Sequence, residues 1–444
     1  MLKVLRISIV ILIFTVSITF SGNVVAQENT SDSVLHEATL ENVVKYALEH
    51  QPAVQQALLD QRITEKNIQG RLADWYPQVN FVYNYQRNIQ LQSSIIGGEV
   101  VRFGVNNTSA VQFNATQNLF NRDVLLASST ASKVRLQAEQ NTVRTKIDMT
   151  VDVTKAFYDL LATQQQVRIG EEDIIRLQRS LKDAESQYAA GVADKTDFKR
   201  ATIQLANGKA LLKSNQELVK FKEEYLKTLI GYPRDQKLNI LYDTLQMEEE
   251  VYLDTLQPLN YSEHIDYRIL YTQRELQKAN VKYNYWSFIP TLSAFGSYIL
   301  NYQNNEFSEL YSRDYPYSYV GASLNFPLFQ GGKRIARIQE QKYTLKRIDY
   351  DLVNLKNNLS TEYTRAIAAY KSNLANYVAL KDNVALATEV YDVVKLQYTS
   401  GVRPFLDVTI AETDLQTMRI NYFNALYQVL ASKMDVLRAL GQIK

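Results

Sequence analysis

One long internal repeat constrains this chain more than any other feature of its sequence. Residues 187–192 recur as residues 397–402, with Gln, Tyr, Gly and Val in the same places and an offset of 210 residues. Asp197 and Asp407 match at the same offset. The units of stacked-repeat proteins are much shorter, about 20–50 residues, so we expect a duplicated fold. The expected organisation is a first repeat at 27–231, a linker at 232–262 and a second repeat at 263–444.

The first 26 residues have the features of an export signal. Lys3 and Arg6 precede an apolar stretch at 7–20, and small residues at 24–26 offer a cleavage site. A single membrane anchor is the competing interpretation, but the apolar stretch is shorter than the roughly 20 residues that a spanning helix needs. We therefore expect residues 1–26 to be a signal peptide that is removed after export. Its two basic residues account for the formal net charge of +2.

The composition excludes several classes of protein. The chain contains no cysteine, which excludes a disulfide scaffold, a cysteine-ligated metal and a thiol nucleophile. The three histidines are isolated, and no metalloprotease, nucleophile-elbow or phosphate-loop motif is present. With 49 basic and 47 acidic residues, the chain has no basic excess for nucleic acid. We expect no enzyme, no cofactor, no metal site and no nucleic-acid partner.

A two-residue alternation of apolar and polar side chains predicts one β-hairpin in each half, at about 77–120 and about 290–329. In the first hairpin, Val79, Phe81 and Tyr83 alternate with polar residues. An apolar face opposite Asn, Gln, Ser and Thr over about ten residues suits a lipid-facing, water-lined barrel strand. A soluble antiparallel sheet with one face on a core gives the same alternation.

Aromatic residues beside the predicted strands favour the membrane interpretation. Trp75 and Tyr76 precede the first strand, and Trp286 and Phe288 precede the third, so all four would lie at one membrane interface, where amphipathic rings prefer to sit. Four strands cannot close a barrel, and an open edge in lipid leaves backbone groups unpaired. Three copies would supply twelve strands, an even number within the range of such barrels.

Long helices are expected after each hairpin. Residues 122–190 contain no proline and a single glycine, which predicts a helix of roughly 100 Å. Returning helices are expected at about 195–230 and 405–440, so that hairpin tips fall near Gly191 and Gly401. Heptad stripes predict close helix pairing. The first stripe is Val153, Leu160, Val167, Ile174, Leu181 and Tyr188, with Tyr370, Tyr377, Val384, Tyr391 and Tyr398 as its equivalents in the second half.

This duplicated plan, together with the Tyr-x-x-Gly turns at both tips, resembles the TolC-type outer membrane efflux protein family over essentially the whole chain after residue 26. The resemblance implies an α+β membrane protein, a homotrimer whose twelve-stranded β-barrel lies in outer membrane lipid and continues into a periplasmic α-helical tunnel. It also implies an exit duct of a tripartite efflux pump or a type I secretion system. The implied partners are a periplasmic adaptor protein and an inner-membrane RND or ABC transporter.

The resemblance also assigns residues at the tips. Tyr398 and Arg403 stand where the family has a closing latch, and Thr196 and Asp197 stand at the positions that this pair would bond. Asp407 matches an acid that forms a ring in the tunnel mouth, whereas Ile410 replaces the second ring acid of some members, which puts a double ring in doubt. The positions implied to contact the adaptor are Gly191, Val192, Gly401 and Val402.

Each of these residues also has an interpretation as a structural residue with no role in a latch. Asp197 and Asp407 would favour a helix N-terminus through the helix dipole, Tyr398 fits a heptad seam, and Arg403 would suit a solvated loop. At the level of the whole chain, the alternative to a duct is a periplasmic coiled-coil scaffold or adaptor without a channel. The sequence does not name a substrate.

Overall fold

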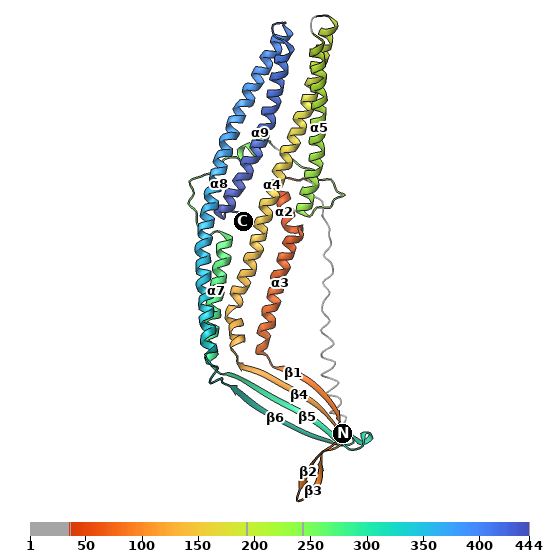
Figure 1. Cartoon of the computed structure of the whole chain (residues 1–444), viewed down its shortest axis with the longest axis vertical. Coiled ribbons are helices and arrows are strands. Elements are labelled where there is room, and N and C mark those ends of the chain that lie inside the picture. Colours follow the sequence, from red (N-terminus) through yellow and green to blue (C-terminus); the bar gives the residue numbers. More distant parts are fainter. Residues whose placement is uncertain (1–34, 36, 192–193, 242–243, 444) are drawn as a thin grey trace.

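Figure 1 shows an elongated molecule, in which long helices run from a curved sheet at one end to two helical hairpins at the other. The computed structural model describes residue 35 and residues 37–191, 194–241 and 244–443. The predicted signal peptide at 1–26 and the tip residue Val192 lie outside the described residues.

The two halves repeat one order of elements. The first half consists of α2 (Leu40–His50), α3 (Pro52–Leu72), η1 (Ala73–Trp75), β1 (Gln78–Arg87), β2 (Gln92–Ile96), β3 (Glu99–Phe103), β4 (Asn107–Phe120), α4 (Arg122–Ala189) and α5 (Lys195–Ile230). After α6 (Thr244–Glu249), the second half consists of α7 (Ile265–Tyr285), η2 (Trp286–Phe288), β5 (Thr291–Asn304), η3 (Phe307–Glu309), β6 (Asp314–Asn325), α8 (Lys333–Thr399) and α9 (Phe405–Leu440). The predicted α+β plan with duplicated halves is therefore confirmed.

The four long strands form one antiparallel sheet in the order β1-β4-β5-β6, so the two halves meet at the β4–β5 pair. The strands β1 and β6 are its edges, and neither is paired on its outer side within the described residues. The first predicted hairpin contains an additional small hairpin, β2–β3, that projects beyond the sheet (Figure 1). The second is shorter than expected, because β6 ends at Asn325 and Phe329 lies beyond it.

Apolar residues recur at helical spacing over 38–74, which predicts one continuous helix there, but the structure has a break between α2 and α3. Gln51 has an extended backbone, with φ −68° and ψ 127°, and Pro52 begins α3. A proline disfavours the helical conformation in the residue before it and suits the first position of a helix. The chain therefore bends between α2 and α3 and follows α4 toward the sheet (Figure 1).

The heptad stripes are the packing surfaces of the long helices. Tyr370, Tyr377, Tyr391 and Tyr398 of α8 are all buried, and the rings of Tyr377 and Tyr422 of α9 stack with centroids 5.6 Å apart. Val153 and Leu160 of α4 are fully buried. Helices α4 and α8 contain 68 and 67 residues. A rise of 1.5 Å per residue gives each a length of about 100 Å, as the sequence predicts.

The segment between the halves lies against the helices near the middle of the molecule. Tyr158 of α4 donates a hydrogen bond to Glu250 Oε2 at 2.6 Å, and Lys381 of α8 donates one to Glu248 Oε2 at 2.6 Å. Tyr370 donates to the carbonyl of Val251 at 2.9 Å. These contacts attach the segment to both halves. The division of the chain at residues 231 and 262 stays a prediction.

Each returning helix ends at a left-handed glycine, Gly231 and Gly441, 210 residues apart. Gly441 has φ +73°, and a Cβ there would lie 3.0 Å from the carbonyl carbon of Glu263 and 3.1 Å from Cα of His264. The glycine is thus required both by its backbone conformation and by the close approach of the chain that begins α7.

We expect Gly441→Ala to destabilise the protein more than Gly191→Ala. Both residues have a positive φ, which costs a residue with a Cβ roughly 1–2 kcal/mol, but a Cβ at Gly191 would meet no atom within 4 Å. Crowding at Gly441 adds about 1–3 kcal/mol. The measurement is the midpoint of thermal unfolding in detergent, and equal midpoints for the two variants would contradict this reading of Gly441.

Candidate functional site

The four-stranded sheet has one apolar and one polar face. Its register places Val79 opposite Ala115, Phe81 opposite Phe113, Val111 opposite Leu300 and Leu292 opposite Leu324. In the single chain, several residues of the apolar face are largely exposed, including Val79, Phe81, Val320 and Leu324. Exposed apolar patches of this extent are rare on water-soluble monomers and mark interaction surfaces.

The opposite face carries mostly polar side chains, as the alternation predicts. Asn80 lies opposite Asn114, and Ser297 donates a hydrogen bond to Asn114 Oδ1 at 2.7 Å. Apolar and aromatic exceptions on this face include Val82, Ile299, Phe295 and the tyrosines of β6. The rings of Phe295 and Tyr319 have centroids 6.2 Å apart. The Phe295 ring lies over Gly321, where a Cβ would come within 2.7 Å of it, so the missing side chain of one strand makes room for the ring of the next.

The four interface aromatics predicted from the sequence gather at the helical end of the sheet. Trp75 belongs to η1 and Tyr76 follows it, while Trp286 and Phe288 are the first and last residues of η2. Tyr76 is 70% exposed and Phe288 47% exposed. Cations lie over two of the rings, since Lys282 Nζ is 5.4 Å from the centre of Trp286 and the Arg334 guanidinium carbon is 4.8 Å from that of Phe288.

A second aromatic cluster at the far end of the sheet was not predicted. The loop between β5 and β6 folds back on the apolar face and fully buries Leu310. Tyr83 of β1 and Tyr311 of the loop are hydrogen-bonded at 2.9 Å, and the rings of Tyr85 and Phe307 lie 5.6 Å apart. The apolar face is thus bordered by aromatic rings at both ends, the arrangement typical of a strand that crosses a bilayer.

At the helical tips, the structure brings some of the predicted latch residues together. Tyr398 is 9% exposed, and its hydroxyl donates a hydrogen bond to Gln187 Oε1 at 2.7 Å. Burial, followed by the negative charges of Asp197 and Asp183, raises the pKa of the Tyr398 hydroxyl. Tyr398 therefore joins the second-half tip to the first-half tip within one chain.

Arg403 has a different partner from the one expected. Its Nη1 donates to Asp407 Oδ2 at 3.0 Å and its Nε to Gln397 Oε1 at 2.8 Å. Among the described contacts, none joins Arg403 to Thr196 or Asp197. Thr196 instead donates its backbone N–H to Asp194, the N-cap of α5, and Asp197 lies in the first turn of that helix. Because half of the Arg403 side chain is exposed, another chain can still reach it.

The tip glycines are where expected, with Gly191 and Gly401 at φ +70° and +74° in the two turns. Val402 beside Gly401 is 72% exposed. Ile410, which stands at the place of a second ring acid, is 51% exposed on α9. An apolar side chain therefore occupies an exposed position one turn beyond Asp407.

A row of polar contacts joins α4 of the first half to α9 of the second, and the heptad analysis did not reveal it. We call it the α4–α9 polar ladder. Its rungs are Asp148–Arg438 at 2.6 Å, Lys155–Asp435 at 2.5 Å, Gln166–Asn424 at 2.7 Å, Glu172–Arg419 at 2.8 Å and Arg176–Glu412 at 3.9 Å. The numbering rises along α4 and falls along α9, as antiparallel helices require. The joint between the halves therefore combines this row of polar contacts with buried apolar residues, among them Leu160 and Leu426.

Neither a metal centre nor a spanning helix is found in the part of the chain that the structure describes. Within residues 37–191, 194–241 and 244–443, no group of three or more His, Asp or Glu side chains could hold a metal ion. Among the same residues, no helix combines the length and apolar character needed to cross a bilayer.

Comparison with known proteins identifies the class to which this fold belongs. The family model described as "Outer membrane efflux protein" matches residues 43–232 and 271–442. Since it matches most of the chain, the protein belongs to this family. The predicted family is thus confirmed, and the chain is an outer-membrane exit duct with its helical part in the periplasm.

Two relatives cover nearly the whole chain at low identity, and a third covers two thirds of it. The outer membrane efflux protein BepC of Brucella suis is 22% identical over 96% of this chain and 89% of its own length. The outer membrane protein TolC of Vibrio cholerae is 20% identical over 93% of each protein. The alkaline protease secretion protein AprF of Pseudomonas aeruginosa is 21% identical over 67% of this chain and 60% of its own length.

Solved structures share the fold. The outer membrane protein VceC of Vibrio cholerae superposes with a TM-score of 0.70 at 15% identity, covering 90% of this chain and 96% of its own. The CmeC outer membrane channel of Campylobacter jejuni gives a TM-score of 0.72 at 15% identity, covering 90% and 85%. The predicted fold class is the one that these proteins have.

A matched pair of arginine substitutions tests which face of the sheet meets lipid. Ala322 lies on the apolar face and Ser323 on the polar face of β6, and both are exposed in the single chain. We expect Ala322→Arg to lower the yield of membrane-inserted protein, since arginine on the lipid face costs up to about 2–4 kcal/mol. Ser323→Arg should insert normally. The measurement is the heat-modifiable, folded fraction on a gel, and the reverse order of the two variants would show that the faces are exchanged.

Proposed function

We propose that three copies of this chain form one continuous channel, which serves as the exit duct of a tripartite efflux pump or a type I secretion system. The observation that carries the proposal is the four-stranded sheet with two free edges and an apolar face, attached to helices of about 100 Å. Edge pairing between copies would satisfy the backbone groups of β1 and β6, and three copies give twelve strands, an allowed barrel size.

The helices would extend this barrel as a tunnel across the periplasm. Their tips would meet a periplasmic adaptor protein, with an inner-membrane RND or ABC transporter beyond it. Exposed apolar side chains near the tips, such as Val402 and Ile410, support a docking role for this end.

The alternative, a periplasmic scaffold or adaptor without a channel, leaves the sheet unexplained. Such a protein would need to cover the apolar face with its own chain, but Val320 is 90% exposed and Val79 69% exposed. Efflux and secretion remain two forms of the same duct, as the names of BepC and AprF illustrate.

At the tips, we propose that Tyr398 and Arg403 hold the tunnel closed. Tyr398 would act within the chain through Gln187, and Arg403 would exchange Asp407 for Asp197 or Thr196 of a neighbouring helix. A hydrogen bond to a charged group contributes about 1.5–3 kcal/mol, and three symmetric copies would multiply the effect while keeping closure reversible.

The double variant Tyr398→Phe with Arg403→Ser should have a higher single-channel conductance in planar bilayers, because it removes both closing contacts. Tyr188→Phe is the matched control, since Tyr188 is the first-half counterpart of Tyr398 and stacks on Phe198 while 42% exposed. Its conductance should equal that of the wild type. Unchanged conductance in the double variant would reject the latch.

Asp407 should make the mouth of the channel sensitive to multivalent cations. Three carboxylates around one axis attract cations electrostatically, so Asp407→Asn should lose the block of current by di- or trivalent cations added on the helical side. Asp414→Asn, which alters an exposed acid two turns along the same helix, should keep it. Equal block in wild type and Asp407→Asn would rule out an acidic ring at this position.

A further inference from the structure

The α4–α9 polar ladder contains one buried charge cluster that neither the tip latch nor the apolar face uses. Asp173 and Arg176 of α4 and Glu412 of α9 form it, in the tunnel wall below the tips. Asp173 is 3% exposed and Glu412 6% exposed. Acidic side chains are rarely buried to this degree unless they are paired. The partners of these two acids therefore determine whether each carboxyl is stable in its charged form.

One guanidinium faces two carboxylates in the cluster. Arg176 Nη2 forms an ion pair with Asp173, although the two groups are not aligned as a hydrogen bond. Arg176 Nε is 3.9 Å from Glu412 Oε1, which is beyond hydrogen-bonding distance. No donor of the described residues makes a hydrogen bond to Glu412 Oε1. When both acids are ionised, the three side chains carry a net charge of −1, which the positive charge of Lys395 partly offsets.

The charged and titratable groups around Glu412 are mostly engaged with other partners. On α4, Glu172 pairs with Arg419 of α9. On α8, Lys395 Nζ donates to the hydroxyl of Tyr391 at 3.1 Å. Desolvation therefore dominates and raises the pKa of the Glu412 carboxyl, while the positive charges of Arg176 and Lys395 lower it by less.

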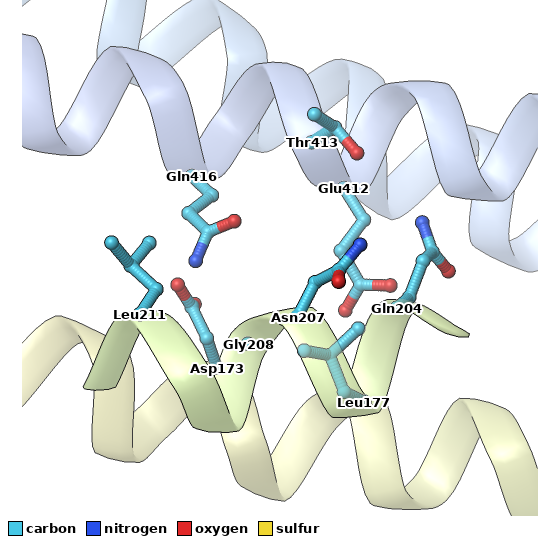
Figure 2. A pocket seen from close by; sticks show the side chains of 9 residues that line it. All are labelled: Asp173, Leu177, Gln204, Asn207, Gly208, Leu211, Glu412, Thr413 and Gln416. Atoms are coloured by element: carbon cyan, nitrogen blue, oxygen red, sulfur yellow. The ribbon is translucent and has the colours of Figure 1, made fainter. Parts of the chain in front are cut away.

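A cavity lined by both polar and apolar side chains, including Leu177 and Leu211, adjoins the two acids between α4, α5 and α9 (Figure 2). Its volume is about 190 Å³, and Figure 2 shows Asp173 and Glu412 pointing into it beside polar side chains. Those side chains are Gln204 and Asn207 of α5 and Thr413 and Gln416 of α9. A space of this size with several polar partners accommodates water. The cavity leaves space between α5 and α9 beside Glu412, while apolar residues of both helices, among them Ala201 and Ala411, pack in one buried cluster.

We propose that Glu412 makes this cluster a second closing contact of the duct, controlled by protons and independent of the tip latch. The proposal rests on the duct function. In the closed packing Glu412 is buried, whereas separation of α9 from α4 returns it to water. Protonation removes the net negative charge of the cluster and favours the closed packing, while the ionised carboxylate favours separation.

The sign of the pH dependence follows from the direction of the pKa shift. The pKa of Glu412 is raised in the closed packing relative to its value in water, so protons bind more tightly to the closed state. Lowering the pH therefore stabilises closure. The stabilisation is fully present below the ordinary pKa of a glutamate and is lost as the pH rises through the raised value.

Spin labels on α4 and α9 test this movement directly. The chain has no cysteine, so Glu171→Cys and Asp414→Cys, both at exposed positions, introduce unique labelling sites in the full chain in detergent. We expect the distance between the labels to increase from pH 4 to pH 8. In a Glu412→Gln background the short distance should persist at both pH values, and Glu412→Asp should restore the increase.

Glu185→Gln is the matched control, because it makes the same chemical change in an exposed acid of α4 outside the polar ladder, and it should keep the wild-type increase. An increase of the same size in Glu412→Gln, or none in the wild type, would overturn the proposal.

Single-channel recording of the same proteins distinguishes a failure of the duct function from a failure of the role assigned to Glu412. The absence of any channel would reject the duct, whereas a channel without the distance change would reject only the role of Glu412. Recording in an Asp407→Asn background removes titration of that acid from the comparison.

Discussion

The two unpaired edges of the four-stranded sheet are the constraint on which the rest of the structure depends. The edge strands β1 and β6 present rows of backbone N–H and C=O groups, and the face beside them is apolar. In lipid each unpaired group costs several kcal/mol, while in water the apolar face would remain uncovered. Both problems disappear when neighbouring copies pair edge to edge. The duplicated chain then places two helical pairs beneath every four strands, so closing the barrel also arranges the helices in a ring.

The helices are joined by two kinds of contact that differ in how easily they separate. Within the second half, α8 and α9 pack through buried aromatic residues such as Tyr377 and Tyr422. Between the halves, α4 and α9 meet through buried apolar residues such as Leu160 and Leu426 and through the polar ladder. The charged groups of the ladder are partly exposed, for example 29% and 47% for Lys155 and Asp435. Exposed ion pairs contribute only about 0–1 kcal/mol each, because water replaces the partner at little cost. The charged part of the joint can therefore separate at little cost, whereas the buried apolar residues beside it resist opening.

Much of the fold could be predicted from the sequence because its signals are local and repeated. The offset of 210 residues revealed the duplication, and the two-residue alternation around Phe81 and Phe113 predicted which face they share, which the register confirms. The tyrosine stripe of α8 predicted a buried seam. These signals depend on periodicity, and periodicity survives the loss of any single residue.

What the sequence did not reveal depends on contacts between distant segments. The outer aromatic cluster forms because the β5–β6 loop carries Tyr311 back to Tyr83, 228 residues away along the chain. The polar ladder was missed because its members lie outside the apolar heptad stripes and would be interpreted singly as solvated charges. The pairing of Arg403 with Asp407 depends on the conformation of the turn at Gly401, which the repeat located without describing its side chains.

Disulfide crosslinking between β1 and β6 tests the central claim most directly. The two strands lie at opposite edges of the sheet in one chain, and the chain has no other cysteine. Single cysteines are placed along the polar faces of β1 and β6, and pairs of positions are oxidised in membranes. The account predicts covalent dimers and trimers on a denaturing gel for pairs in register, and none larger than a trimer. Crosslinking confined to single chains, or a series that continues beyond three copies, would contradict it.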